Sequence, residues 1–397
     1  MWTDIRPEVE MPRLFERGGD VISFAGGLPD LDVLPLETIS AQLSRLVRLG
    51  GKLALQYTTP HVAGALVPAI NDLMAREGTT AGAERLVPTG GSQMGLMAVG
   101  LGIAAPGETV LVQTPAYPGA AAAFRTAGLT LHPAPEDTDG LDPAALRETV
   151  LRLRAAGRTV RLLYCNPTFQ NPTGATLCVA RRHELLAAAR ELDLLLIEDN
   201  PYGLLSFDGE TTTALHALDP DRVVYLGTFS KVFAPGLRCG WIAAPEQLAR
   251  TLRRTTEIMS LSPSALAQAA LAAFHTRAGW SDLLDAYRTS YKERCALMAD
   301  ALEAELGTDG PWQWERPGGG FYIWLRHRDG VDTTRFAEAA AEHGVSYVPG
   351  SHFGIDGEHA DGLRLCFSNV ARGRIAEGVT RLAAALSAPV PALRGAA

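Results

Sequence analysis

A lysine and an arginine stand seven positions apart in the most informative stretch of this sequence, VVYLGTFSKVFAPGLRCGW at 223–241. The apolar run Val223–Leu226 is typical of a buried strand, and Lys231 follows it in a loop that contains Thr228 and Ser230. Burying Lys231 beside Arg238 costs free energy unless an anion balances the charges, and a phosphate is the simplest such anion. The simplest chemical use of such a lysine is an imine with an aldehyde. A phosphate and an aldehyde together indicate pyridoxal phosphate (PLP) as the cofactor.

Five motifs together resemble those of one enzyme family. The stretch at 223–241 resembles the lysine motif of class I and II aminotransferases, which are enzymes of PLP fold type I. The other four motifs are GGSQMGL at 90–96, NPTFQNPTG at 166–174, IEDNPYG at 197–203 and GLRLCFS at 362–368. They follow the family's order, and the resemblance covers nearly the whole chain. It is greatest to the branch with the 2-aminoadipate aminotransferases and the effector domains of MocR-type regulators.

The resemblance implies three catalytic residues. Lys231 would form a Schiff base with PLP and later move a proton between the substrate Cα and the cofactor carbon, which requires a lowered lysine pKa. Asp199, which follows the apolar run LLLIE, would pair with the protonated pyridine nitrogen and keep the ring an electron sink. Tyr202 would share the cofactor's ring oxygen with Asn171. Without the resemblance, each residue has an ordinary alternative. Lys231 could be a solvated surface lysine, Asp199 a carboxylate that caps a turn, and Tyr202 a core tyrosine.

Glycines and hydroxyls gather where the resemblance places the phosphate. The residues at 90–93 precede an apolar helix, so the first backbone N–H groups of that helix would point at the phosphate. The guanidinium of Arg238 suits two-pronged phosphate binding, and Tyr117 would stack on the ring. An N-cap serine at Ser92 and a surface ion pair at Arg238 are the alternatives. The predicted cofactor-binding residues are Gly91, Ser92, Gln93, Tyr117, Asn171, Asp199, Tyr202, Thr228, Ser230, Lys231, Arg238 and Tyr57.

Substrate binding is predicted at Arg364, Asn171 and Gly27. Arg364 stands inside the apolar run Leu363–Phe367, where an arginine needs a fixed anionic partner. The resemblance implies that this partner is the substrate α-carboxylate; a neighbouring acid is the alternative. Gly27 resembles the glycine that packs on the bound substrate, and Tyr57 resembles the tyrosine that reaches the neighbouring subunit's phosphate, so a homodimer is expected. A turn glycine and a core tyrosine are the alternatives.

Two positions depart from the family's pattern. Met94 stands where a second glutamine is common, and Ala65-Leu66-Val67 stands where a Leu-Arg pair is usual. Both lie near the binding region by motif. The details of substrate recognition therefore stay open.

Strands alternating with helices are expected between about 85 and 245, which indicates an α/β fold with a mostly parallel seven-stranded sheet between helices. Catalytic groups should then collect at the carboxyl ends of the strands. Helices are expected to begin near Ser92, Tyr117, Asp142 and Val179, with Asp142 as an N-cap before Pro143. The predicted strands are Leu86–Pro88, Thr109–Thr114, Leu129–His132, Val160–Cys165, Leu194–Glu198, Val223–Leu226 and Cys239–Ala243.

After residue 245 longer helical patterns and a second group of strands indicate a smaller α+β domain. Its predicted strands are Trp312–Arg316, Phe321–Arg326, Val345–Val348 and Leu363–Phe367. The expected division is an N-terminal segment at 1–50 that packs with the small domain, a large PLP-binding domain at 51–262, a small C-terminal domain at 263–388 and a loose tail at 389–397.

Bulk composition narrows the class of protein. The 397 residues suffice for two domains, and a net charge of −8 argues against nucleic acid as a main partner. No run approaches the roughly 20 apolar residues of a membrane span, and the first ten residues lack the apolar core of a signal peptide. Five scattered cysteines without CxxC spacing fit a reducing cytoplasm, and nine histidines without ligand spacing indicate no metal site.

The sequence thus predicts a PLP-dependent aminotransferase that moves the α-amino group of an L-amino acid to a 2-oxo acid, with 2-oxoglutarate or pyruvate expected. One alternative is another PLP reaction on an amino acid, such as β-elimination, decarboxylation, cyclisation or oxidation, because the cofactor carries the chemistry. A second is the effector domain of a ligand-sensing regulator. Against it, only about 50 residues precede the expected PLP-binding domain, and they contain no recognisable helix-turn-helix. The amino acid donor is not identified.

Overall fold

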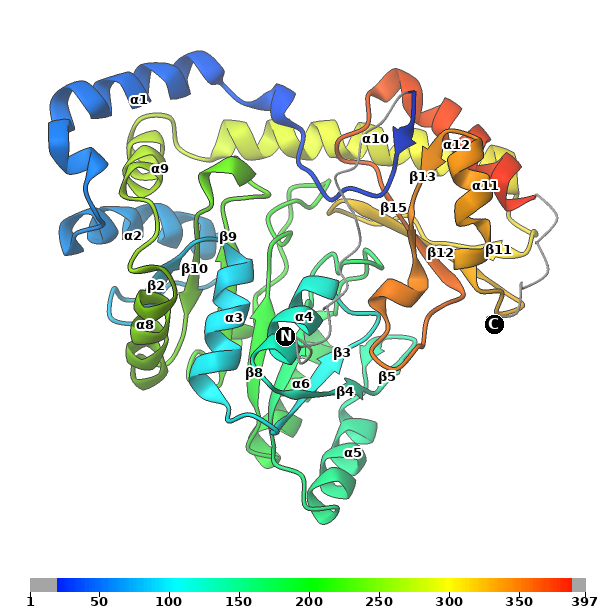
Figure 1. The fold of residues 1–397 in the computed structure, drawn as a ribbon, viewed down its shortest axis with the longest axis horizontal. Coiled ribbons are helices and arrows are strands. Elements are labelled where there is room, and N and C mark those ends of the chain that lie inside the picture. The colour runs from blue at the N-terminus through cyan, green and yellow to red at the C-terminus, as the bar shows by residue number, and fades with distance from the viewer. Residues whose placement is uncertain (1–19, 388–397) are drawn as a thin grey trace, which may run out of the picture.

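A seven-stranded sheet forms the centre of the molecule in a computed structural model that describes residues 20–387 (Figure 1). The predicted tail at 389–397 lies outside the described residues. Strand β10 is antiparallel to both neighbours and the other pairings are parallel, so the mostly parallel sheet is confirmed. The strands, in spatial order, are β2 (Leu86–Thr89), β10 (Gly240–Ala243), β9 (Val223–Thr228), β8 (Leu195–Asp199), β7 (Val160–Cys165), β3 (Thr109–Gln113) and β4 (Thr130–Ala134).

Helices cover both faces of this sheet, because alternate residues of each central strand point in opposite directions. Val110 and Val224 pack into one apolar core, whereas their neighbours Leu111 and Val223 pack into another. The first core lies under α3 (Ser92–Ile103), α4 (Pro118–Thr126) and α8 (Glu246–Ser260). The second lies under α5 (Pro143–Ala155) and α6 (Val179–Glu191).

A second, four-stranded antiparallel sheet lies at the other end of the chain. It consists of β11 (Trp312–Gln313), β12 (Tyr322–His327), β15 (Gly362–Cys366) and β14 (Val348–Pro349). The long α10 (Ser281–Leu306) runs along the top of Figure 1 and packs against α12 (Arg372–Leu386). Short elements complete the chain: α7 (Leu215–Leu218), α11 (Ala337–Glu342) and the hairpin of β5 (Glu136–Asp137) and β6 (Gly140–Leu141).

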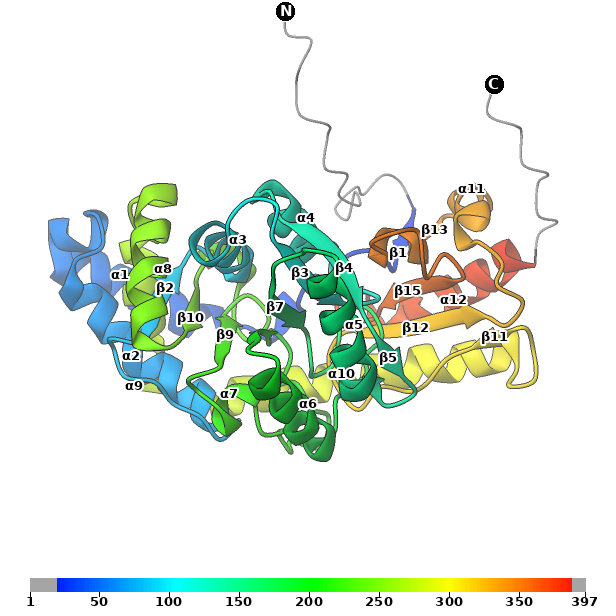
Figure 2. The ribbon, with the colours of Figure 1, turned by 90° about the horizontal axis from the view of Figure 1, so that it is seen from below.

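The first described residues contact both ends of the molecule. Strand β1 (Ile22–Ser23) pairs with β13 (Val345–Ser346), whereas α1 (Leu36–Gly50) packs against α9 (Ala265–Ala278). Helix α9 also packs against α2 (Pro60–Ala75), and Figure 2 shows α1, α2, α8 and α9 at the end opposite β11, β12, β15 and α12. The predicted domain boundaries stay a prediction.

Local signals in the sequence place most elements correctly. Helix α5 begins at Pro143, and the side chain of Asp142 accepts hydrogen bonds from the backbone N–H of Ala144 and Ala145, as an N-cap does. The predicted strand Val345–Val348 is divided at Tyr347 into two short strands that join different sheets. The predicted strand Trp312–Arg316 is shorter, since only its first two residues pair with β12.

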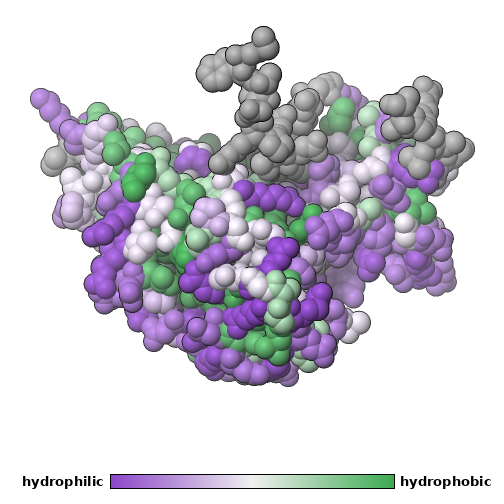
Figure 3. Space-filling model, turned by 60° about the horizontal axis from the view of Figure 1, so that its bottom comes forward, coloured by the Kyte–Doolittle hydropathy of each residue, from purple (hydrophilic) through white to green (hydrophobic). Residues whose placement is uncertain are grey.

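Hydrophilic side chains form most of the outline of the face shown in Figure 3, with smaller apolar areas between them. Among the helices of residues 20–387, none combines the length and apolar character that crossing a bilayer requires.

Candidate active site

The predicted site residues collect at the carboxyl ends of neighbouring parallel strands. Asp199 is the last residue of β8 and Thr228 the last of β9, while Asn171 follows β7 in a loop. Lys231 follows β9 after a short turn in which the hydroxyl of Thr228 accepts a 3.1 Å hydrogen bond from the N–H of Ser230. Because parallel strands end at the same edge of a sheet, these groups face one another.

Lys231 is partly buried and contacts the N-terminal segment. Its Nζ donates a 2.7 Å hydrogen bond to the carbonyl oxygen of Gly27 and lies 5.6 Å from the ring centroid of Phe321. Burial lowers the lysine pKa from 10.5 to about 8, and the positive charges of Arg364 and Arg238 contribute to the lowering. This environment favours the neutral amine and is not that of a solvated surface lysine.

Asp199 is a buried carboxylate with one oxygen satisfied and one not. Tyr164 donates a 2.9 Å hydrogen bond to Oδ2, while Oδ1 finds no hydrogen-bond partner among the described residues. Burial raises the pKa of Asp199 to about 6, and Tyr164 and Lys231 oppose that rise. Leaving a buried acceptor unpaired costs about 1–3 kcal/mol, so the site is suited to a ligand that brings an N–H. The pyridine N–H of PLP meets that requirement.

Tyr164 was not among the predicted site residues. It lies on β7, beside β8, with its ring packed edge-on against Phe124. The only signal in the sequence is a hydroxyl-bearing side chain one residue before the end of an apolar strand, which also occurs in ordinary cores.

Arg364 is fully buried on β15, and its hydrogen-bond partners are uncharged. Nη1 donates to Oδ1 of Asn171 at 2.8 Å and Nη2 to the carbonyl oxygen of Ala25 at 2.6 Å. Its guanidinium carbon lies 4.4 Å from the ring centroid of Tyr322 and 5.1 Å from that of Phe353. Nε is buried without a partner in the part of the chain that the structure describes. The guanidinium thus keeps its positive charge available for an anion such as a carboxylate.

A cradle for a phosphate forms where α3 begins. Gly91 is the N-cap of α3 with a φ of 99°, so the N-cap serine considered for Ser92 is wrong. Exposed Arg238 donates a 3.0 Å hydrogen bond from Nη2 to the carbonyl oxygen of Gly90, and a Cβ at Gly91 would lie 2.7 Å from that nitrogen. The backbone N–H of Gly90 donates in turn to the sulfur of Met94, so this departure from the family's pattern supports the turn. Helix N–H groups and an arginine together suit a phosphate.

Tyr117 and Gln93 lie beside this cradle. Tyr117 immediately precedes α4, and its hydroxyl donates to Oε1 of Gln93 at 3.2 Å, while Nε2 of Gln93 donates to the carbonyl oxygen of Gly119. Burial and the charge of Asp199 raise the pKa of Tyr117 to about 12, so the phenol stays neutral. A neutral aromatic ring near Asp199 fits the predicted stacking on a pyridine ring.

The N-terminal segment closes the site through its backbone. The carbonyl oxygens of Ala25, Gly27 and Leu28 accept hydrogen bonds from Arg364, Lys231 and Ser368 respectively. A Cβ at Gly27 would lie 2.3 Å from the hydroxyl oxygen of Tyr322, which in turn lies 2.9 Å from the hydroxyl of Tyr202. Sequence reasoning missed Tyr322, whose signal is one more aromatic residue in a buried strand.

Tyr57 is the one predicted site residue that the structure leaves outside this group. Its side chain is 69% exposed, on the segment between the 3-10 helix at 51–55 and α2. Its predicted role involves a neighbouring subunit and stays a prediction.

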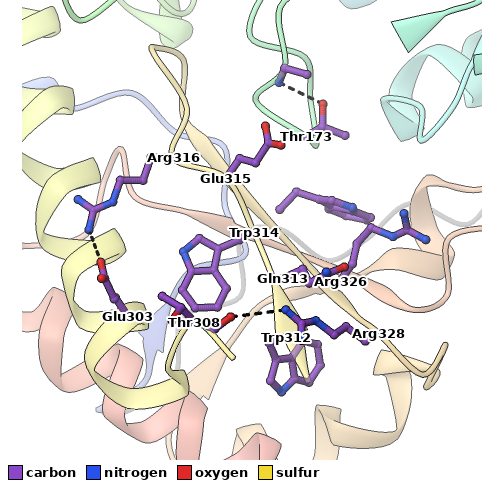
Figure 4. A pocket seen from close by; sticks show the side chains of 12 residues that line it. Thr173, Glu303, Thr308, Trp312, Gln313, Trp314, Glu315, Arg316, Arg326 and Arg328 are labelled. Carbon is purple, nitrogen blue, oxygen red and sulfur yellow. Dashed lines mark hydrogen bonds and ion pairs between the residues drawn. The ribbon is translucent and has the colours of Figure 1, made fainter. Parts of the chain in front are cut away.

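A separate surface cavity of about 650 Å³ lies beside the loop that contains Thr173 (Figure 4). Thr173 and Ala175 of that loop form part of its wall, together with Trp312, Trp314 and Trp324. Lys231 and Asp199 do not line it, so this cavity is distinct from the site. No group of His, Cys, Asp and Glu within residues 20–387 could hold a metal ion.

Known proteins are similar to this chain in sequence and in fold. The family "Aminotransferase class I and II" matches residues 20–382. An aromatic-amino-acid aminotransferase of Thermococcus litoralis is 36% identical over 377 residues, 94% of this chain and 89% of that protein. A kynurenine aminotransferase of Pyrococcus horikoshii, solved in complex with PMP, has a TM-score of 0.87 at 32% identity, with 94% of this chain and 92% of that chain covered. LysN of Thermus thermophilus, an α-aminoadipate aminotransferase complexed with N-(5'-phosphopyridoxyl)-L-leucine, has a TM-score of 0.85 at 32% identity over 92% of each chain.

Proposed function

Because this chain belongs to the class I and II aminotransferase family, we propose that its site moves the α-amino group of an L-amino acid to a 2-oxo acid with the predicted residues in their predicted roles. The protein is a PLP-dependent aminotransferase of PLP fold type I, as its sequence predicts. The individual roles, the acceptor, the assembly and the location are our proposals.

The residues divide into three tasks. Asp199 would hold the pyridine nitrogen through Oδ1, and Asn171 and Tyr202 would hold the ring oxygen. Arg238, Ser230 and the N-terminus of α3 hold the phosphate. When bound, the cofactor supplies an electron sink that stabilises negative charge at the substrate Cα. Arg364 would orient the substrate carboxylate, and the neutral amine of Lys231 would take the proton from the substrate Cα and deliver it to the cofactor carbon.

One observation carries this proposal: the buried Oδ1 of Asp199, which has no hydrogen-bond partner among residues 20–387, lies in the same site as a lysine whose pKa is lowered. An ordinary buried carboxylate has its acceptors satisfied. The combination is expected where a protonated ring nitrogen completes the site.

The test is a half-reaction followed by absorbance. Purified protein loaded with PLP is mixed with a panel of L-amino acids, including aromatic amino acids, kynurenine and 2-aminoadipate, which the names of the relatives suggest. An amino acid that serves as donor should abolish the visible absorbance in a single turnover, and adding 2-oxoglutarate or pyruvate should restore the absorbance. Continuous product formation without any oxo acid would instead indicate elimination, decarboxylation or another PLP reaction.

The expected homodimer is supported by apolar side chains that face solvent in the single chain. Leu55, Tyr57, Ile258 and Leu261 are between 66% and 87% exposed. Near them lies a mostly apolar groove of about 510 Å³ formed by residues of 58–67, 83–88 and 253–268. A second copy would cover this surface and bring its Tyr57 to the phosphate. Sedimentation should give twice the chain mass, and Ile258→Asp should shift it toward the monomer.

A cytoplasmic location is also our proposal. It is supported by the five cysteines, all of which are free thiols in the structure. Fractionation of the producing cells would test it.

A further inference from the structure

Tyr322 stands where the small sheet meets the active site. It begins β12, directly opposite Cys366 of β15, and two residues along the same face Trp324 lies opposite Arg364. Because residues opposite each other in an antiparallel pair share a face, Tyr322 points to the side on which Arg364 lies. The side chain is buried, with 1% of its surface exposed.

The phenol of Tyr322 touches three functional groups at once. Its hydroxyl lies 2.9 Å from the hydroxyl of Tyr202, and the two rings meet edge to face. Its ring lies under the guanidinium of Arg364 at 4.4 Å. Its hydroxyl also fills the space that a side chain at Gly27 would need.

The direction of the Tyr202–Tyr322 hydrogen bond follows from counting protons. Burial raises the pKa of both phenols well above 10, so each hydroxyl carries one proton at neutral pH. The proposed function requires the Tyr202 hydroxyl to donate a hydrogen bond to the ring oxygen of the cofactor. Because it has one proton, it can then only accept a hydrogen bond from Tyr322. Tyr322 is then the donor of the pair. A hydroxyl that accepts one hydrogen bond becomes a stronger donor in the next.

We propose that Tyr322 is a positioning residue whose hydroxyl donates to Tyr202, aims the Tyr202 proton at the cofactor ring oxygen, and joins that group to Arg364 and Gly27. This inference rests on the proposed function, because the direction is fixed only if Tyr202 serves the cofactor. Tyr202, which would hold the ring oxygen, and Arg364, which would hold the substrate carboxylate, would thus both contact the side chain of Tyr322.

Tyr322→Phe tests the hydroxyl, since it keeps the ring under Arg364. In the PLP-loaded protein the pH midpoint of the visible absorption change should rise by about 0.3–0.6 unit, because Tyr202 becomes a weaker donor to the ring oxygen. Tyr202→Phe should raise it further, and adding Tyr322→Phe to Tyr202→Phe should change nothing more. Tyr347→Phe is the matched control, because Tyr347 is also buried and its hydroxyl bonds to the backbone carbonyl of Thr333.

A second measurement needs no cofactor. Gly27→Ala should lower the melting temperature strongly in the wild-type background, where its Cβ would lie 2.3 Å from the Tyr322 hydroxyl. In the Tyr322→Phe background the loss should be smaller, since the next atom is a ring carbon at 3.4 Å. Equal losses in the two backgrounds would contradict the position of the hydroxyl.

The outcomes separate the two claims. A protein that gains no visible absorbance with PLP would overturn both the proposed function and this inference. If the protein does gain visible absorbance, two results would overturn this inference alone. One is an unchanged pH midpoint in Tyr322→Phe. The other is a Tyr322→Phe shift of the midpoint that is just as large in the Tyr202→Phe background.

Discussion

The Nζ of Lys231 lies 2.7 Å from the carbonyl oxygen of Gly27, 204 positions earlier in the chain. This hydrogen bond joins the residue expected to do the chemistry to the segment at 25–28, which has no polar side chain and contributes its backbone. It holds the amine in a partly buried place where burial lowers its pKa to about 8. The contact therefore links the stability of the protein to the protonation of one lysine.

Replacing that lysine should abolish turnover and stabilise the protein without cofactor. In Lys231→Met the folded protein no longer carries this buried, protonated amine at pH 7. The folded pKa of about 8 lies below the unfolded value of 10.5, so the unfolded state binds the proton more tightly and the wild type gains stability as pH rises between them. Urea denaturation should show the variant about 2–3 kcal/mol more stable at pH 7, with a smaller gap at pH 9.5.

Lys292→Met, at an exposed position of α10, is the matched control and should change neither turnover nor the pH dependence. Measurable transamination by Lys231→Met would remove the lysine from the mechanism.

The carboxylate of Asp199 should matter far more than the phenol that supports it. Asp199→Ala removes the partner of the ring nitrogen and should lower kcat/KM by about 1000-fold or more. Tyr164→Phe removes one hydrogen bond of 2.9 Å to the same carboxylate and should cost about tenfold. Steady-state kinetics with saturating PLP would measure both, and a larger effect of Tyr164→Phe than of Asp199→Ala would be inconsistent with these roles.

Arg364→Lys should impair substrate binding rather than the chemical step. A lysine cannot donate to Asn171 and Ala25 while presenting two parallel N–H groups to a carboxylate. The KM for the amino acid should rise about 10- to 100-fold, with a smaller change in kcat. Arg326→Lys, an exposed position two residues beyond Trp324 on β12, is the control and should leave KM unchanged. A decrease in kcat with an unchanged KM would contradict a role of Arg364 in substrate binding.

Glu77 predicts a pH dependence of stability outside the site. Its buried carboxylate accepts hydrogen bonds of 2.6 Å from Asn200 and 2.8 Å from Tyr225, and burial raises its pKa from 4.5 to about 7. The folded state therefore binds the proton more tightly than the unfolded state, and stability falls as pH rises from 4.5 through 7. Relative to Glu77→Gln, the wild type should lose about 2–3 kcal/mol across that range in urea denaturation.

The exposed Glu210→Gln is the control for charge removal in the same region. A wild type that shows the same pH profile as Glu77→Gln would mean that this carboxyl group does not titrate there.

Strand ends and motifs make most of the site residues predictable from the sequence. Tyr164 and Tyr322, which support those residues, are not predictable in this way. Lys231, Asp199 and Arg364 each interrupt or follow an apolar run, where a charge is conspicuous in the sequence. Tyr164 and Tyr322 are aromatic residues within apolar strands, and only the fold brings them to partners 35 and 120 positions away. The division of the predicted strand Val345–Val348 is unpredictable for a related reason: its two valines pack into different cores, which a run of four residues does not reveal.

Backbone carbonyls, rather than side chains, join the segment at 25–28 to Arg364, Lys231 and Ser368. Every amino acid carries the same carbonyl, so these three hydrogen bonds do not depend on the side chains at 26 and 28, whereas Ala25 is packed in a core and Gly27 has no room for a Cβ. Natural variants could thereby acquire new preferences among donors while the chemical machinery stays intact. A truncation that removed the chain up to residue 28, in contrast, would remove all three acceptors together.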